Sequence, residues 1–291
     1  MIDLRVKKMT VILILIFLLL LTSSCRNKGS DIILSGSTSV QPYAEKLADL
    51  YMAKYPGTGV VVLGGGSSTG IQAVDSGTAG IGMSSRALKP AELYKDPDAE
   101  ELELKLITYE IAKDGLAIIV HPDNPIRELT LKEIRDIYMG DTTNWSKLGG
   151  NDAKIHVSTR EEGSGTRSAF EDLVMDKNRI TKKAIVQDSN GSIRQFVSDD
   201  INSIGFISLG LVETHKGQKP VKALKLDGVE ATDENIINGS YSLYRSFLLV
   251  TRLDPDEKIK QFIDYVLSPE GQQILVKEGL ISVITAEKSE E

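Results

Sequence analysis

The sequence predicts an α/β protein whose mostly parallel sheets carry helices on both faces and divide between two lobes. Short apolar runs alternate with helical segments through residues 31–86, and this alternation is typical of a parallel sheet. The expected strands there are 32–34, 60–63 and 81–83, with helices at 39–55 and 69–74 between them. At 291 residues, the chain is long enough to form two lobes rather than one.

The rest of the chain continues in the same way. Strands are expected at 116–120, 155–157, 185–187, 204–208 and 247–250, and helices at 89–103, 131–139, 168–175, 192–198 and 255–278, the last interrupted at Ser268 and Pro269. Pro122 and Pro125 stiffen the connection where we expect the chain to cross into the second lobe, and 241–251 is the expected return. The predicted lobes are therefore 31–119 with 241–291 (lobe I) and 120–240 (lobe II). The charged end, 285–291, is expected to be disordered.

The N-terminus has the features of a signal peptide, which we assign to residues 1–24. Basic residues precede an unbroken apolar run, Val11–Leu21, whose 11 residues fall short of the roughly 20 that a membrane-spanning helix needs. Cys25 is the only cysteine of the chain, so no internal disulfide can form. Residues 21–25 resemble a bacterial lipobox, although Thr22 stands where leucine is more usual. This resemblance implies lipidation of Cys25, with 25–30 as anchor and tether. A conventional cleavage site near Cys25 is the alternative.

The chain without its signal peptide is acidic. After removal of residues 1–24, it has 31 Lys and Arg against 40 Asp and Glu, a net charge of −9. Nucleic-acid binding needs a basic footprint, so this charge argues against a nucleic-acid partner. It does not argue against a small anion, because a local cluster of amides can set the field at a site whatever the total charge.

A Gly-, Ser- and Thr-rich loop within Thr159–Phe170 is the strongest functional signal. A short apolar run ends before it and a helix is predicted after it, so the loop lies at a strand-to-helix turn. The first amides of a helix lack intrahelical partners and glycines allow the backbone to approach a ligand, which together favour anion binding. Arg160, four residues before Ser164, can offer a guanidinium fork to a tetrahedral oxyanion.

The same pattern occurs twice upstream, at Ser35–Ser39 and Gly64–Gly70, each after an apolar run and before a helix. Ligands of open parallel sheets bind beyond the carboxyl ends of the strands, where these loops fall. Ser84–Arg86, after the third strand, adds hydroxyls and a cation at that edge. We therefore predict that three helix N-termini converge on one anion. The alternative is that serine and threonine are ordinary helix caps and glycine an ordinary turn residue.

Catalysis and metal binding are less well supported. Gly66–Gly70 fits the G-x-S-x-G pattern of serine hydrolases. The candidate histidines, however, lie at the expected hinge (His121), within a strand (His156) and in a polar loop (His215). Acidic pairs occur without an accompanying His/Cys cluster. We therefore expect a protein that is not an enzyme and that holds no metal or cofactor.

Several segments resemble, in order and spacing, the phosphate-binding protein (PstS type) of the high-affinity phosphate ABC transporter. They are Ser35–Val40, Gly66–Gly70, Ile81–Arg86, Arg160–Arg167 and Tyr265–Gly271. The resemblance covers essentially the whole chain after the signal peptide. It implies a type II periplasmic-binding-protein-like fold, whose two lobes close over the ligand about a two-strand hinge. It also implies a monomeric lipoprotein on the extracytoplasmic face of the membrane that delivers inorganic phosphate to an ABC permease and ATPase complex.

Carried over residue by residue, the resemblance places phosphate-binding residues in both lobes. They are Ser37, Thr38, Ser39, Ser67, Ser68, Ser85, Arg86, Arg160, Glu162, Ser164, Gly165 and Thr166. Ser85 departs from the family, in which many members have aspartate as acceptor for a phosphate proton. Because sulfate carries no such proton at neutral pH, an unpaired acceptor penalises sulfate. Glu162, or another acceptor, is expected to take this role.

The main alternative to phosphate is another ligand bound by the same fold: sulfate, molybdate, or a phosphorylated or organic anion. Besides a solute-binding protein and an enzyme, the third class of function to consider is a receptor or adhesion role at the cell surface. A hydroxyl-rich site with few arginines favours phosphate.

Overall fold

The computed structural model describes residues 31–213 and 219–284. The predicted signal peptide (1–24), the anchor and tether (25–30) with Cys25, His215 and the charged end (285–291) lie outside the described residues.

The strands are β1 (Ile32–Gly36), β2 (Val60–Gly64), β3 (Ile81–Ser84), β4 (Leu106–Val120), β5 (Glu128–Leu129), β6 (His156–Arg160), β7 (Ile185–Gln187), β8 (Ser203–Ser208), β9 (Lys222–Ala223), β10 (Lys225–Leu226) and β11 (Tyr244–Arg252). The α-helices are α2 (Gln41–Lys54), α3 (Ser67–Ser76), α4 (Pro90–Leu93), α5 (Leu131–Met139), α6 (Gly165–Phe170), α7 (Asn190–Asp199), α8 (Asp233–Ile237), α9 (Glu257–Leu267) and α10 (Pro269–Lys277). Short 3-10 helices η1 (Trp145–Leu148) and η3 (Leu209–Leu211) and a π-helical turn η2 (Glu171–Met175) also occur.

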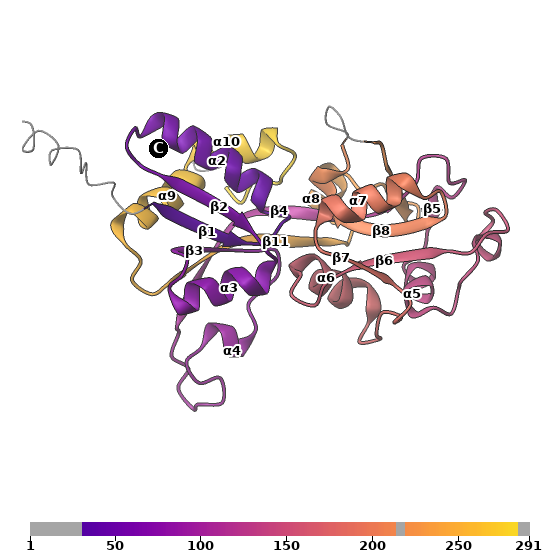
Figure 1. Ribbon diagram of the computed structural model, residues 1–291, viewed down its shortest axis with the longest axis horizontal. Helices are drawn as coiled ribbons and strands as arrows, with labels where there is room; N and C mark the ends of the chain where they lie inside the picture. The colour runs from indigo at the N-terminus through magenta and orange to yellow at the C-terminus, as the bar shows by residue number, and fades with distance from the viewer. Residues whose placement is uncertain (1–30, 214–218, 285–291) are drawn as a thin grey trace, which may run out of the picture.

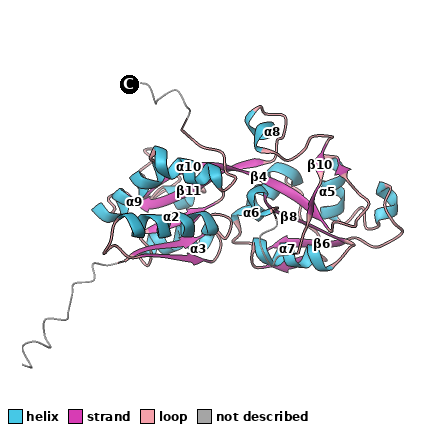
Figure 2. Cartoon of the chain, turned by 90° about the horizontal axis from the view of Figure 1, so that it is seen from above, coloured by secondary structure: helices cyan, strands magenta, loops and turns pink. Residues whose placement is uncertain are grey.

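One sheet extends through both halves of the molecule, in the order β2-β1-β3-β11-β4-β8-β6-β7, with β9 paired to β4. The outer strands of each half are parallel to one another, whereas β4 and β11 run antiparallel to their neighbours. The long β4 pairs with β11 over Leu106–Gly115 and with β8 over Leu116–Val120. β4 and β11 therefore join the two halves (Figure 1), and Figure 2 shows β4 passing between them from above.

Helices cover both faces of the sheet in each half. In the first half, α2, α9 and α10 pack on one face and α3 on the other. In the second half, α5, α6 and η2 pack on one face and α7 on the other. Phe170 of α6 stacks on Phe206 of β8 with ring centroids 4.2 Å apart, and burying one such side chain contributes about 1.5–3 kcal/mol. The predicted two-lobed α/β architecture is confirmed.

The hydrophobic core changes from one half to the other within the strands that join them. Ala112 and Phe247 belong to the core of the first half, whereas Leu116 and Leu243 belong to the core of the second. Only a few residues of β4 and of the start of β11 lie between these pairs, so the connection is a short pair of antiparallel strands. The lobe boundaries assigned after residues 119 and 240 stay a prediction.

The predicted helix at 89–103 is wrong over most of its length. Only Pro90–Leu93 is helical, and Tyr94 then forms an antiparallel bridge with Leu104. Pro97 lies between them; it has no amide hydrogen to continue a helix and disfavours helical backbone at the preceding residue. The strand predicted at 116–120 begins earlier, at Leu106.

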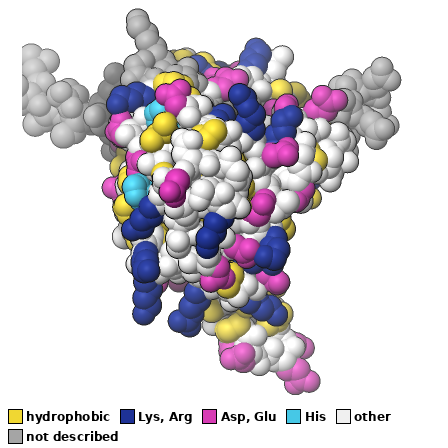
Figure 3. Space-filling view, turned by 90° about the vertical axis from the view of Figure 1, so that its right-hand side faces the viewer, with side chains coloured by type: hydrophobic (Ala, Val, Ile, Leu, Met, Phe, Trp, Pro, Cys, Tyr) yellow, Lys and Arg dark blue, Asp and Glu magenta, His cyan; other side chains and the backbone are white. Residues whose placement is uncertain are grey.

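Within 31–213 and 219–284, no helix has the length and apolar character needed to cross a membrane. Figure 3 views the end of the second half, where basic and acidic side chains are interspersed rather than separated into fields of one sign.

Candidate anion-binding site

The predicted loops meet at the carboxyl ends of the strands, in the middle of the molecule (Figure 1). α2 follows β1, α3 follows β2 and α6 follows β6, so each loop is a strand-to-helix turn as predicted. A further turn of this kind, which was not predicted as part of the site, leads from β7 into α7. The helix starts of both halves therefore lie around one region, where their unpaired amides and hydroxyls can act together.

Three buried serines form one hydrogen-bonded group in the first half. Ser37 Oγ donates to Ser85 Oγ at 2.9 Å, and Ser67 Oγ lies 3.4 Å from Ser85 Oγ. The Ser85 amide donates to Ser67 Oγ at 3.1 Å. None of the three is more than 2% exposed. Because a hydroxyl both donates and accepts hydrogen bonds, this group can donate to an unprotonated oxyanion oxygen and can also accept a hydrogen bond from a protonated one.

Arg160 supplies the charge from the second half and is 1% exposed. Its Nε and Nη2 each donate to a carboxylate oxygen of Glu161 at 2.9 Å, and Nη2 also donates to the Asp188 carbonyl at 3.1 Å. Nη1 is buried and has no hydrogen-bond partner in the described part of the chain. Leaving a buried polar group unpaired costs about 1–3 kcal/mol, and more for a charged group. Arg160 Nη1 is therefore suited to bind an anion.

The two halves contact each other through the predicted side chains. Ser39 Oγ, from the first half, lies 2.8 Å from Thr166 Oγ1 of the second. Arg160 Nη2 donates to Thr38 Oγ1 at 3.3 Å. The Ser68 amide donates to the Gly163 carbonyl at 3.1 Å. The conformation is therefore one in which both halves enclose the same polar cluster.

Gly165 of the second half packs closely against the serine group of the first half. A Cβ added there would lie 2.2 Å from Ser67 Oγ and 2.5 Å from Ser85 Oγ. Gly165 and Thr166 are the first residues of α6 and both are buried. As the first amides of a helix, they have no partner within it and are available as donors at the cluster.

Ser68, Arg86 and Ser164 stand at the edge of this cluster. Arg86 forms a bidentate pair with Glu92, both bonds at 2.7 Å, and donates from Nη2 to Ser68 Oγ at 3.0 Å. Burial alone would raise the pKa of Glu92, but the bonds from Arg86 and from the Lys89 amide outweigh it and lower this pKa. Ser164 caps α6, since its Oγ accepts from the Arg167 amide at 3.2 Å. Arg86 therefore positions Ser68, and Ser164 positions α6.

Glu162 is the predicted residue that the structure does not bring to the cluster. It is exposed and lines a surface depression with Arg167 and Arg179 instead. Glu161, its neighbour, is the carboxylate that pairs with Arg160. Because Glu162 is exposed in this depression rather than in the cluster, we no longer expect it to be the acceptor for a phosphate proton, and the selectivity of a Glu162 variant tests this.

Four polar residues of the site, Asn190, Arg245, Asp114 and Ser208, were not predicted from the sequence. Asn190 Nδ2 donates to Ser39 Oγ at 2.9 Å, and Arg245 Nη2 donates to the same oxygen at 3.0 Å. Asp114 and Ser208 support them from β4 and β8. A signal for Asn190 was present, because residues 188–192 repeat the strand, polar loop and helix pattern. Arg245 and Asp114 carried no comparable signal, because each lies in a strand that contains other charged residues as well.

The hydrolase alternative gains no support from the histidines. His156 Nδ1 lies 2.6 Å from Asp200 Oδ2, and His121 Nδ1 accepts from the Asp123 amide at 3.1 Å. Neither is a partner of Ser67 in the part of the chain that the structure describes. Over the same residues, no group of three or more His, Cys, Asp or Glu side chains could hold a metal ion.

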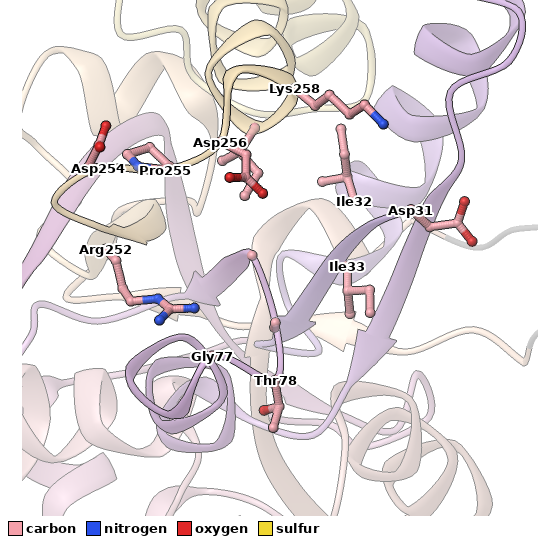
Figure 4. A pocket seen from close by; sticks show the side chains of 13 residues that line it. Asp31, Ile32, Ile33, Gly77, Thr78, Arg252, Asp254, Pro255, Asp256 and Lys258 are labelled. Carbon is pink, nitrogen blue, oxygen red and sulfur yellow. The ribbon is translucent and has the colours of Figure 1, made fainter. Parts of the chain in front are cut away.

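A separate cavity of about 320 Å³ lies at the opposite end of the first-half strands. It is formed by the start of β1, the turn before β3 and the end of β11, and Figure 4 shows Arg252 directed towards the turn at Gly77. Charges of both signs line it, including Arg252, Lys258 and Asp256. It contains none of the predicted site residues.

The comparisons with known proteins agree with this fold and site. The family model of the PBP superfamily domain matches residues 23–270. The chain is similar to a solved structure from Clostridium perfringens, which is described as a phosphate ABC transporter substrate-binding protein with bound phosphate. The TM-score is 0.80 and the sequence identity 43%, and the match covers 88% of this chain and 100% of that one. The chain is thus defined as a PBP superfamily protein of the two-lobed, solute-binding type.

Curated relatives specify the family further. The chain is 30% identical over 286 residues to phosphate-binding protein PstS of Borreliella burgdorferi, which covers 94% of this chain and 99% of the relative. It is 27% identical over 295 residues to phosphate-binding protein PstS of Bacillus subtilis, and the match covers 95% of this chain and 94% of the relative. The chain belongs to the PstS family of phosphate-binding proteins.

Proposed function

We propose that this protein is an extracytoplasmic solute-binding lipoprotein that captures inorganic phosphate between its halves and delivers it to an ABC permease and its ATPase. The observation that carries the proposal is the buried cluster built by both halves, in which Arg160 Nη1 has no partner among the described residues. Family membership supports the same ligand, since a related structure contains phosphate.

Capture is proposed to occur by closure of the two halves about β4 and β11. Ser37, Ser67 and Ser85 lie on one side and Arg160 and Thr166 on the other. An anion that bonds to both sides stabilises the closed arrangement by its greater affinity for that state. Each neutral donor contributes about 1 kcal/mol and each charged one about 1.5–3 kcal/mol, so many modest bonds add to selective binding.

Anchoring at the membrane is proposed to occur through Cys25. The apolar run before this cysteine and its lipobox-like context support lipidation. Because a single acyl chain holds a protein only marginally, we expect the multiple acylation of bacterial lipoproteins. Cys25→Ser should release the protein from the membrane fraction, and continued membrane association would contradict the anchor.

Sulfate is the second candidate ligand, and a specific observation favours it. Ser85 provides a hydroxyl, and within 31–213 and 219–284 no carboxylate is hydrogen-bonded to the Ser37, Ser67 and Ser85 group. A hydroxyl can donate a hydrogen bond to an unprotonated oxygen as well as accept one from a protonated oxygen, so it discriminates less between sulfate and phosphate than an acceptor-only carboxylate.

Isothermal titration of the purified protein with phosphate, sulfate, arsenate and molybdate, at neutral pH and near pH 5, tests the proposal. We expect one-to-one phosphate binding at both pH values with sulfate weaker. Tighter sulfate or molybdate binding would keep the fold and overturn the ligand.

A further inference from the structure

A buried ion pair lies where the chain passes between its halves. Asp114 and Arg245 are direct partners in the register of β4 and β11. Arg245 Nε and Nη2 donate to Asp114 Oδ2 at 3.1 and 3.0 Å, and Ser208 Oγ donates to Asp114 Oδ1 at 2.5 Å. Asp114 is 2% and Arg245 6% exposed. Asp114 is therefore held on both carboxylate oxygens and fixes the orientation of the guanidinium.

The guanidinium of Arg245 extends into the anion-binding cluster. Its Nη2 donates to Ser39 Oγ at 3.0 Å. Its Nη1 is buried without a hydrogen-bond partner in the described residues, as is Nη1 of Arg160. Burial lowers the pKa of Arg245, Asp114 opposes this change, and the nearby charge of Arg160 lowers the pKa further. Arginine nevertheless stays protonated in proteins. Nη1 of Arg160 and Nη1 of Arg245 are therefore two positively charged donors beside the same cluster, and neither has an acceptor among the described residues.

Arg245 also fixes the direction of a hydroxyl hydrogen. Ser39 Oγ accepts from Arg245 Nη2 and from Asn190 Nδ2, so both of its acceptor positions are filled. The orientation of the Asn190 amide is set in turn, because its Oδ1 accepts from the Ser208 amide at 3.3 Å. The Ser39 hydroxyl must therefore donate, and its remaining partner here is Thr166 Oγ1 at 2.8 Å.

We propose that Arg245 is a second oxyanion-binding arginine, whose Nη1 donates to the bound anion while its Nη2 orients Ser39 as an obligate donor. The ligand class is a tetrahedral oxyanion that directs unprotonated oxygens towards Arg245 and Ser39. The Ser37, Ser67 and Ser85 group can then accept a hydrogen bond from a protonated oxygen of the same anion. This inference rests on the proposed function. It also places a ligand contact on the strands that join the halves.

Isothermal titration with inorganic phosphate tests this proposal through Arg245→Lys. Lysine keeps the charge beside Asp114 but cannot supply three separately directed nitrogens. Arg194→Lys is the matched control, because Arg194 is a buried arginine whose Nη1 donates to the Leu211 and Val212 carbonyls, away from the cluster. We expect Arg245→Lys to weaken phosphate binding at least ten-fold and Arg194→Lys to leave the Kd within two-fold. Equal affinities for the two variants would overturn the proposal.

The melting temperature of the ligand-free protein separates an effect on folding from an effect on binding. It reports the stability of each variant, whereas the Kd reports the contact with the anion. If Arg245→Lys does not fold, the double variant Arg245→Met with Asp114→Asn is used instead, because it removes both charges of the buried pair together. If this double variant binds phosphate as tightly as the unaltered protein, the proposal is again overturned. In a Ser39→Ala background, Arg245→Lys should cost less than in the unaltered protein, because part of its effect acts through Ser39.

The unaltered protein distinguishes the two hypotheses. If it binds phosphate and Arg245→Lys binds equally well, only the role of Arg245 fails. If it binds sulfate instead, the Kd values of the same variants are measured with sulfate as the ligand, and equal values would again overturn the role of Arg245. If it binds no oxyanion, the proposed function and the role of Arg245 both fail.

Discussion

Replacing Arg160 with alanine should weaken phosphate binding by at least ten-fold while the fold remains. The Nη1 atom of Arg160 is buried without a partner among the described residues. A single bond from a charged donor contributes about 1.5–3 kcal/mol, and each 1.4 kcal/mol corresponds to about ten-fold in affinity. One lost bond therefore predicts roughly ten-fold to one-hundred-fold, and a second bond from the same nitrogen would increase the loss.

The fold should tolerate this change because the main partner of Arg160 is not deeply buried. The Glu161 side chain is 33% exposed, so its carboxylate can be solvated once the guanidinium is removed. The bonds to Thr38 Oγ1 and to the Asp188 carbonyl are also lost. We expect the free energy of unfolding to fall by no more than about 2 kcal/mol.

The assay is isothermal titration with phosphate, together with the melting temperature of the ligand-free protein. Arg135→Ala is the control, since Arg135 lies on α5 and its Nε donates to the Val174 carbonyl at 2.7 Å, outside the cluster. An unchanged Kd for Arg160→Ala would remove Arg160 from the site. A lower affinity for Arg135→Ala as well would indicate a general effect of arginine removal.

Three further predictions concern other parts of the site. Gly165→Ala should impede closure and weaken phosphate binding by ten-fold or more, because its Cβ would lie 2.2 Å from Ser67 Oγ; titration showing wild-type affinity would contradict this. Glu92→Gln should destabilise the protein at pH 7 by about 2 kcal/mol, since a bidentate partner of Arg86 is weakened. Because the pKa of Glu92 is lowered in the folded state, this stability is present above the ordinary value of 4.5 and is lost as the pH falls through the lower folded value; in denaturant unfolding, a difference between the variant and the unaltered protein that does not decrease as the pH falls below 4.5 would refute it. Glu162→Gln should leave the ratio of sulfate to phosphate affinity unchanged, because Glu162 is exposed outside the cluster, and a changed ratio would restore Glu162 as the proton acceptor.

The loops of the site could be predicted because their backbone requirements are local. Glycines and hydroxyl residues between an apolar run and a helix specify a strand-to-helix turn within about ten residues, and Arg160 directly precedes one such turn. The order of strands and helices then places these turns at one edge of each parallel sheet. Sequence alone therefore determined the α/β class, the two lobes and the central hydroxyl-rich cluster.

The pairing of distant charges was decided only by the tertiary structure. Asp114 and Arg245 are 131 positions apart and meet because the register of β4 and β11 makes them direct neighbours. The choice between Glu161 and Glu162 as the partner of Arg160 likewise depends on which way each side chain leaves the loop. Local preferences specify where a turn forms, but strand register and side-chain direction depend on packing across the whole molecule, which neighbouring residues in the sequence do not encode.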